Sequence, residues 1–371
     1  MASYNVAQGE AVLQAKLNKA IEAGRSSAVG VIQRIQNEMP VDRVVKTDGL
    51  VFSQENGNLV VEASEMTKVG NGVEGRRSTR LGSVHRNALS QLATRADLPM
   101  AYATTLLDRG DWGRDLLAEN LNTIFGKTAP QRVLSRAVNG QVRGVLSDSY
   151  RRLDARPIIE AFASSCQKVG AIPVEGVGGD LRLSIRALLP MVFKSASEVF
   201  AFGISIGTSD FGAGALSVEG FLMRLACLNG MTMQEELRKI HIGGRIDQDM
   251  QLSQKTYNLD AKAMASAVTD IVQKVLAPER VNGTLDLIGK AATEKIDPAT
   301  SFRALAKKGL LKRELEAAED VYRSGGVEQL PPGDTTYRMA NALSWIAKTA
   351  ETPERRMELE AMAGEIVLKA A

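Results

Sequence analysis

The chain has 371 residues, of which 44% are hydrophobic, 24% charged and 5% aromatic, enough apolar material for a buried core and too much for disorder throughout. It lacks the run of about 18 apolar residues that a membrane-spanning helix needs, and its start is polar where a signal peptide would be apolar. We therefore expect a cytoplasmic protein.

The net charge of +3 is unevenly distributed along the chain. Residues 76–156 contain fourteen Lys and Arg against seven Asp and Glu, a net +7, whereas residues 1–75 (seven against nine) and 157–371 (twenty-five against twenty-seven) are each −2. Thirteen of the fourteen basic residues are Arg, whose guanidinium pairs bidentately with phosphate and stacks on bases. The distribution predicts a polyanionic partner, most often nucleic acid. The alternative is a solvated face with internal salt bridges.

The first third of the chain is predicted to hold a helix, short strands and a loop. Apolar residues recur at three-to-four spacing over 8–38, with possible breaks at Gly24 and Gly30. Residues 41–69 contain short extended segments separated by turn signals. The polar, glycine-rich stretch 70–82 is typical of a mobile loop, and it would present three arginines, Arg76, Arg77 and Arg80.

The middle of the chain alternates helices with hairpins. Three helical segments are expected at 83–96, 99–109 and 113–126. The Asn139-Gly140 turn between two β-patterned runs then predicts a hairpin over 132–147. A helix over 154–169 and two further strand pairs follow.

From about Gln234 to the end the pattern is almost wholly helical. The predicted fold is α+β: an antiparallel β-hairpin sheet flanked by helices, with a C-terminal helical region. We divide the chain into an N-terminal part with a helix and short strands, a basic α+β core domain and the helical region, at residues 1–75, 76–233 and 234–371.

Two segments match known binding motifs, but each has a simpler structural explanation. Residues 70–75 spell G-x-G-x-x-G, but they lead into Arg-Arg-Ser-Thr-Arg instead of an apolar helix, so a dinucleotide site is not expected. The helices at 83–96 and 99–109 invite a helix-turn-helix interpretation, yet the second is mostly apolar and small. Two packed core helices explain it better, because a recognition helix offers Arg, Asn or Gln to base edges.

Catalytic and metal-binding signals are weak. Cys166 and Cys227 lie in apolar surroundings, as buried structural thiols do. With His85 and His241, the only histidines, they match no zinc spacing. The chain has no G-x-S-x-G, H-E-x-x-H or P-loop motif. We expect neither a metal, nor a cofactor, nor an enzymatic activity.

The segment from Gly144 to Asp154 is the most specific candidate for a contact surface. A hairpin strand ends there in a turn with Tyr150 followed by Arg151 and Arg152. Tyrosine can stack on a base while arginine pairs with phosphate, the combination that grips single strands. The same hairpin carries Arg132, Arg136 and Arg143. In the alternative interpretation, Tyr150 is half-buried and the arginines pair with Asp148 and Asp154.

Three segments resemble a known family. GVLSDSYRRLD with its following helix, FGAGALSVEGFLMRLACLNGMT and TTYRMANALSWIAKTA are similar to parts of the phage/plasmid-like protein family, a domain of unknown function on mobile elements. The matching positions are Ser147, Asp148, Tyr150 and Asp154, then Arg224, Cys227, Asn229, Gly230 and Met231. The resemblance covers roughly residues 80–350. It implies a phage or plasmid origin and no settled activity.

A looser, architectural similarity to phage single-strand annealing proteins of the RecT/Redβ kind implies rings or filaments, and hence a homo-oligomer. Our leading hypothesis is a nucleic-acid-binding protein, with single-stranded DNA favoured and annealing as a possible activity. The rival hypothesis is a self-assembling phage structural or anti-defence protein that acts through protein–protein contacts made by its C-terminal helices. A nuclease-like enzyme would need convergent carboxylates that the sequence does not locate.

Overall fold

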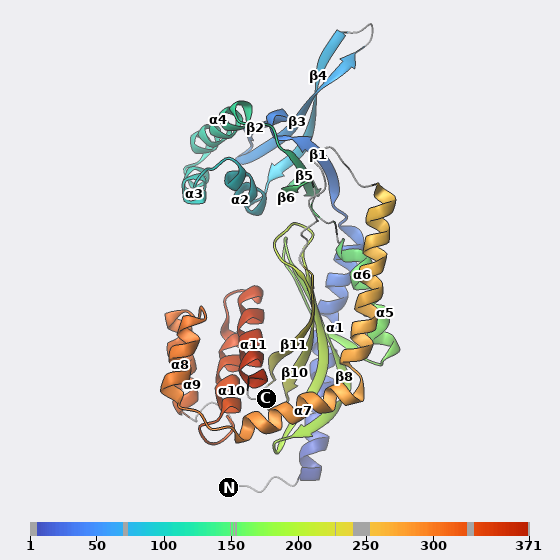
Figure 1. Ribbon diagram of the computed structural model, residues 1–371, viewed down its shortest axis with the longest axis vertical. Helices are drawn as coiled ribbons and strands as arrows, with labels where there is room; N and C mark the ends of the chain where they lie inside the picture. Colours follow the sequence, from blue (N-terminus) through green and yellow to red (C-terminus); the bar gives the residue numbers. More distant parts are fainter. Residues whose placement is uncertain are drawn as a thin grey trace.

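The computed structural model describes residues 6–69, 73–148, 150, 152, 154–226, 228–239, 253–324 and 330–369. Two lobes follow one another along the long axis of the molecule (Figure 1). The first lobe, residues 41–147, has a six-stranded sheet and three helices. The second lobe contains α1 (Val6–Asn37), a five-stranded sheet and the helices that follow residue 154. The predicted α+β class is confirmed.

The first sheet has the strand order β1-β5-β6-β4-β3-β2. All neighbouring strands are antiparallel except β4 and β6, which share a short parallel pairing. The strands are β1 (Val41–Lys46), β2 (Leu50–Glu55), β3 (Asn58–Val69), β4 (Val73–Val84), β5 (Arg132–Val138) and β6 (Gln141–Ser147).

This sheet must curl, because its two edge strands are consecutive in the chain. Only the short 3₁₀ segment Thr47–Gly49 joins β1 to β2. The path from Lys46 to Leu50 can span at most about 14 Å, whereas the edges of a flat six-stranded sheet would stand about 24 Å apart. The edges therefore come together at the connecting segment, and the sheet encloses an apolar interior.

Three helices complete the core of the first lobe: α2 (Arg86–Arg95), α3 (Met100–Asp108) and α4 (Asp111–Lys127). Leu89, Leu92, Leu117 and Leu121 of these helices are buried in one cluster with Phe52 of β2. The two packed core helices favoured for 83–96 and 99–109 are thus present as α2 and α3.

The second sheet is antiparallel throughout, in the order β11-β10-β9-β8-β7. Its strands are β7 (Ile172–Gly178), β8 (Leu183–Ser195), β9 (Glu198–Thr208), β10 (Leu216–Arg224) and β11 (Asn229–Lys239). One face is apolar, with Ile185, Ile206 and Val218, and it shares a core with α5 (Ala155–Lys168) and α6 (Gln254–Val275).

The C-terminal helices surround the rest of this sheet. In Figure 1, α10 and α11 lie on the side of the sheet opposite α5 and α6. The helices are α7 (Pro278–Thr293), α8 (Pro298–Lys307), α9 (Lys312–Ser324), α10 (Thr336–Ile346) and α11 (Pro353–Leu368). The predicted C-terminal helical region is therefore observed, although it begins later than expected.

Three predictions about local structure are wrong. The helix over 8–38 has no break, because α1 runs through both Gly24 and Gly30. Residues 73–82 of the predicted loop belong to β4, which pairs with β3, while residues 70–72 lie outside the described part. The helical region does not start at Gln234, since β11 continues to Lys239. The expected domain boundaries after residues 75 and 233 fall inside β4 and β11.

The polar composition of β4 explains why residues 73–82 were predicted to form a loop. Beyond the sheet, β3 and β4 extend as a two-stranded ribbon (Figure 1). Arg77, Ser78 and Arg80 are exposed on it. Residues 77–80 of β4 have no buried position, unlike Leu81, which joins the core. Such a stretch does not need the alternating apolar residues that signal a half-buried strand.

Candidate functional site

The β5–β6 hairpin lies at the junction of the two lobes, and Arg136 is its most buried cation. Its side chain is 1% exposed. Nε donates to Asp42 Oδ1 of β1 at 2.7 Å, Nη2 donates to Asp154 before α5, and Nη1 donates to the backbone oxygen of Asp210 at 2.9 Å. Arg136 thus ties both lobes together, and a phosphate cannot reach it in this arrangement.

Asp210, in the loop between β9 and β10, belongs to the same cluster. Its Oδ1 accepts a hydrogen bond from the backbone N–H of Ala155, the first residue of α5, at 2.9 Å. Burial raises the pKa of Asp210 to about 6. The charge of Arg136 acts to lower this pKa, and the charge of Asp154 acts to raise it. Burial alone would lower the pKa of the Arg136 guanidinium. The negative charges of Asp42, Asp154 and Asp210 have the larger effect, and the pKa is raised.

Tyr150 is not presented as a stacking platform. It is 8% exposed and packs with Leu134 and Leu146, and burial raises the pKa of its phenol. Arg152 lies 3.5 Å from Asp42 and over the ring of Tyr257 of α6. The burial of Tyr150 and the carboxylate partner of Arg152 agree with the alternative interpretation in kind, but the partner is Asp42 and not the expected Asp148 or Asp154. Arg151 lies outside the described residues.

Two further hairpin arginines are also paired. Arg132 Nε lies 3.6 Å from Asp148 Oδ2. Arg143 is buried, within 3.5 Å of Glu38 and 3.7 Å of Asp180, and its guanidinium stands over the ring of Phe211. The hairpin is where the sequence analysis placed the contact surface, but internal carboxylates occupy most of its cations.

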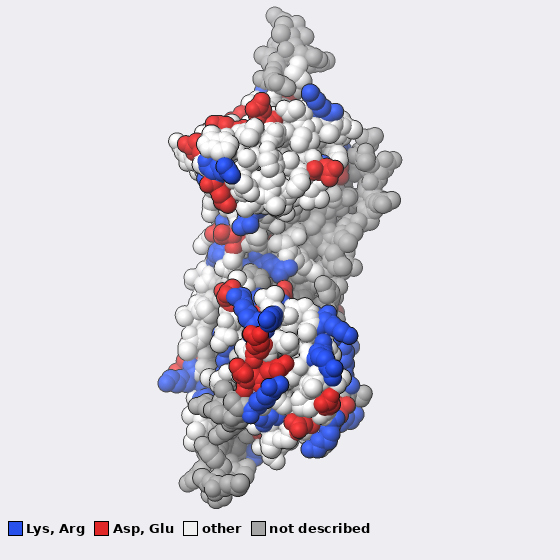
Figure 2. Space-filling view, turned by 90° about the vertical axis from the view of Figure 1, so that its left-hand side faces the viewer, with Lys and Arg blue, Asp and Glu red and all other residues white. Residues whose placement is uncertain are grey.

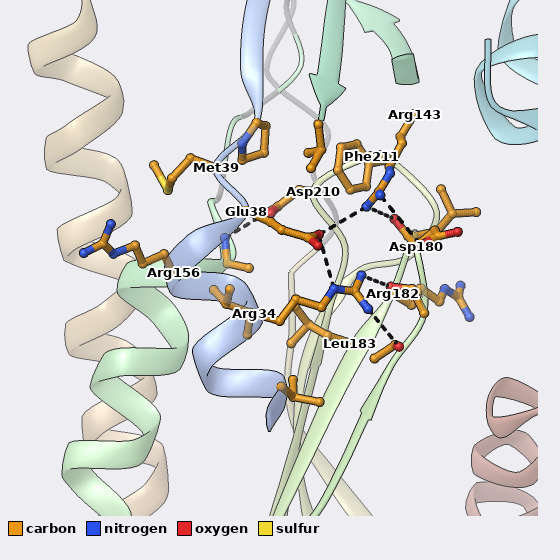
Figure 3. Close-up of a pocket in the computed structure, with 18 of the residues that line it drawn as sticks. Arg34, Glu38, Met39, Arg143, Arg156, Asp180, Arg182, Leu183, Asp210 and Phe211 are labelled. Atoms are coloured by element: carbon orange, nitrogen blue, oxygen red, sulfur yellow. Dashed lines mark hydrogen bonds and ion pairs between the residues drawn. The ribbon is translucent and has the colours of Figure 1, made fainter. Parts of the chain in front are cut away.

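Figure 3 shows the cavity beside Arg143, where the end of α1 meets the β7–β8 turn and the β9–β10 loop. Arg34 donates to the backbone oxygens of Gly178 and Gly179 and pairs with Glu38 at 3.2 Å. The cavity has a volume of about 50 Å³. That is room for one or a few water molecules and too little for a nucleotide.

On the β3–β4 ribbon, the three predicted arginines have different surroundings. Arg80 pairs with Glu55 at 2.7 Å. Arg77 is exposed, and it has no ion-pair partner among the residues that the structure describes. The backbone of Arg76 pairs with Met66 in the ribbon, while its side chain lies outside the described part.

A second group of arginines, which the sequence analysis did not select, belongs to α2 and to the β7–β8 turn, and both of these segments contact the loop 209–214. We call this group, Arg86, Arg95 and Arg182, the waist arginines. Asn87 and Gln91 of α2 both donate to the backbone oxygen of Phe211, and Arg182 Nε donates to that of Ala213. These bonds hold α2 and the β7–β8 turn against one loop. Figure 2 shows Lys and Arg side chains at the narrow middle of the molecule.

The waist arginines differ from the hairpin arginines in their partners. Arg86 and Arg182 are exposed, and Arg95 is half-buried with its Nη1 bonded to the Gln91 backbone oxygen. Within the described ranges none of the three has a carboxylate within ion-pair distance. One sequence signal was available: Arg86 and Arg95 belong to the basic span but stand on a helix otherwise free of charge.

The structure adds little to the question of catalysis. Cys166 is fully buried, and burial raises the pKa of its thiol to about 12. Among the described residues no group of three or more His, Cys, Asp or Glu side chains is placed to hold a metal ion. Cys227 and His241 lie outside them. No described helix combines the length and apolar character needed to cross a membrane.

Comparison with known proteins does not identify the chain. No protein-family model matches it, and no curated protein or solved structure does.

Proposed function

We propose that this chain binds nucleic acid, with single-stranded DNA the favoured ligand, in the cytoplasm of a cell that hosts its phage or plasmid. The observation that supports the proposal is the contrast between two groups of arginines. Those of the hairpin are neutralised by internal carboxylates, whereas the waist arginines have no carboxylate partner among the described residues. Guanidinium groups without carboxylate partners attract a polyanion.

The backbone contacts of these side chains suit phosphate binding. Arg182 uses only Nε for the Ala213 carbonyl, so that its two terminal nitrogens remain without a described partner. Arg95 likewise has one terminal nitrogen on a backbone oxygen. Guanidinium groups fixed at one nitrogen lose less conformational entropy when the others bind phosphate.

Fluorescence anisotropy with a labelled single-stranded oligonucleotide at several salt concentrations tests the proposal. Each phosphate contact contributes about 0.7 to the slope of log K against log salt for single strands. Replacing Arg86 and Arg182 by Gln should lower this slope by about 1.4 and weaken binding of all sequences alike. Lys19→Gln with Arg25→Gln, at exposed positions of α1, is the matched control. Absence of binding at low salt, or salt-independent binding, contradicts the proposal.

Exposed aromatic side chains on α3 and α4 favour protein–protein contact as a second candidate function. Trp112 of α4 is 57% exposed and Tyr102 of α3 41%, and Asp111 and Asp115, on the same helix as Trp112, are exposed. Aromatic side chains of this kind dominate the binding energy of protein interfaces. If Trp112 contributes to a homo-oligomer interface, Trp112→Ala should reduce the mass measured by light scattering without nucleic acid. An unchanged mass contradicts this candidate.

A further inference from the structure

The face of the second sheet that is turned away from α5 and α6 carries a row of small polar residues. Ser184 of β8 pairs with Gly207 of β9, and Gly207 pairs with Ser217 of β10, so the three stand side by side across the sheet. Their chain neighbours Ile185 and Ile206 point into the core with α5 and α6. Because side chains alternate along a strand, this row faces the other way.

A groove lies over this row. It has a volume of about 280 Å³ between the row and Met357, Glu358 and Ala361 of α11. A second cavity of about 300 Å³ continues it toward Lys348 and Arg356 and shares Val177, Ser184 and Met357 with it. At its other end the groove shares Arg182 and Leu183 with the cavity of Figure 3. The groove therefore opens toward the waist.

The hydroxyl of Ser184 lines the groove without a hydrogen-bond partner among the described residues. Ser184 is only 5% exposed and lines both cavities, yet its hydroxyl makes no hydrogen bond to any described residue. Ser217, two strands away, likewise has no described partner. Both hydroxyls line the groove and face its interior, so they can donate to and accept from a ligand that enters it.

The shape of the floor indicates a flat ligand. Gly207 leaves the middle of the row without a side chain, and a glycine inside a strand often marks the close approach of a ligand. A β-carbon built on Gly207 would stand 3.2 Å from Ser217 Oγ and 3.7 Å from Met357 Cε. The empty position is therefore bounded by a hydroxyl that can donate and accept and by a thioether methyl, which packs well on aromatic rings.

The charges decide which part of a nucleotide fits. Arg182, Glu219 and Glu358 line this groove, so it offers no excess of positive charge. The two carboxylates would repel a phosphate group. An uncharged planar ring with polar edges would not be repelled. Arg182 at the mouth belongs to the waist arginines, where the proposed function places phosphates.

We propose that the groove receives one base of the bound strand, flat over Gly207, with its polar edge on Ser184 and Ser217 and its phosphate on Arg182. This inference rests on the proposed function and adds to it a subsite for the base. Gly207 has no positive φ, so Val causes no backbone strain there. Its β-carbon would stand 3.2 Å from Ser217 Oγ, so that hydroxyl must shift slightly for Val to fill the floor.

The test compares an ordinary single-stranded oligonucleotide with an abasic one of equal length, which keeps the phosphates and lacks the bases. The wild-type chain should bind the ordinary strand about tenfold more tightly, the effect of one stacked base. Gly207→Val should bind both strands equally and keep the salt slope of the wild type. Arg86→Gln with Arg182→Gln should instead lower the slope and keep the preference for bases.

A second variant guards against misfolding of Gly207→Val. Ser184→Ala with Ser217→Ala removes two hydroxyls and adds no atoms, and it should also lose most of the preference. Ser164→Ala with Ser266→Ala, at exposed helical positions, is the control. If the wild-type chain binds both oligonucleotides equally, or if both groove variants keep the preference, the subsite is wrong while the waist site stands. If neither oligonucleotide binds, the proposed function fails as well.

Discussion

Asp42 of β1 and Arg136 of β5 stand directly opposite each other on neighbouring strands, and Arg136 Nε donates to Asp42 Oδ1 at 2.7 Å. The same guanidinium bonds to Asp154 and to the backbone of Asp210 in the second lobe. One side chain therefore satisfies groups from three segments that are far apart in the sequence. The arginine expected to contact phosphate is the ionic centre of the junction between the lobes.

Replacing Arg136 by Met should lower the free energy of unfolding by about 3 kcal/mol, because the substitution leaves the half-buried carboxylates of Asp42 and Asp154 without their counter-charge. The contrasting variant is Arg80→Met, which removes the exposed pair with Glu55 and should cost no more than about 1 kcal/mol. Urea unfolding of both variants measures the difference. Equal stabilities would show that Arg136 does not hold the lobes together.

The raised pKa of Asp210 makes stability depend on pH in a definite direction. Its pKa is about 6 in the folded chain against the ordinary 3.8, so between about pH 4 and 6 the folded state binds more protons than the unfolded state. In that window the contribution of Asp210 to stability falls as pH rises.

Asp210→Asn keeps an acceptor for the Ala155 N–H and cannot ionise. Relative to this variant the wild-type chain should lose about 2 kcal/mol of stability between pH 4.5 and 6.5. Other groups, such as Glu175 with its lowered pKa, titrate in both proteins and cancel in the difference. Urea unfolding across this range checks it; a constant difference would mean that the pKa of Asp210 is ordinary.

How far the sequence predicts this molecule depends on whether the signal is local. The hairpin at Asn139-Gly140 was predicted correctly because Asn and Gly are the residues that tolerate the positive φ this turn type demands. Both residues adopt positive φ in the structure. The helices α2, α3 and α4 were predicted because their apolar residues repeat with the helical period. The burial of Arg136 and its internal ion pairs could not be predicted in this way, since its partner Asp42 is 94 residues distant in the sequence. The row formed by Ser184 and Ser217 requires strand register, which sequence patterns do not supply.

Gly24 illustrates the same limit and gives a further prediction. It was expected to break a helix, but it lets α1 approach β7 so closely that a β-carbon on residue 24 would stand 1.5 Å from the Val174 carbonyl oxygen. Gly24→Ala should therefore displace α1 and lower the unfolding free energy by about 1–3 kcal/mol or more. Gly30, in the same helix, has no atom within 4 Å of such a carbon.

Gly30→Ala is thus the matched control, and it should stabilise the chain by about 0.5–1 kcal/mol through helix propensity alone. Thermal unfolding of the two alanine variants compares them under one condition. Opposite shifts of Tm are expected. A destabilised Gly30→Ala, or a Gly24→Ala as stable as the wild type, would contradict the close packing of α1 on β7.

Asn122 of α4 pairs with the edge strand β2 as another strand would. Its amide nitrogen donates to the Phe52 backbone oxygen at 2.9 Å, and its Oδ1 accepts from the Phe52 N–H at 2.8 Å. Asn122→Ala leaves both backbone groups unpaired and should cost about 1–3 kcal/mol. Asn122→Asp keeps the acceptor, loses the donor and sets a carboxylate against the Phe52 carbonyl oxygen, so it should be no more stable than the alanine variant.

Hydrogen exchange distinguishes the two changes, because the Phe52 amide should lose protection in Asn122→Ala and keep part of it in Asn122→Asp. Asn120→Ala removes only an exposed bond to the Tyr102 hydroxyl and should leave both stability and exchange unchanged. Since β2 closes the curled sheet beside β1, the loss at Asn122 should also speed exchange in β1. Fast exchange confined to Phe52 would show instead that the two edges of the sheet open independently.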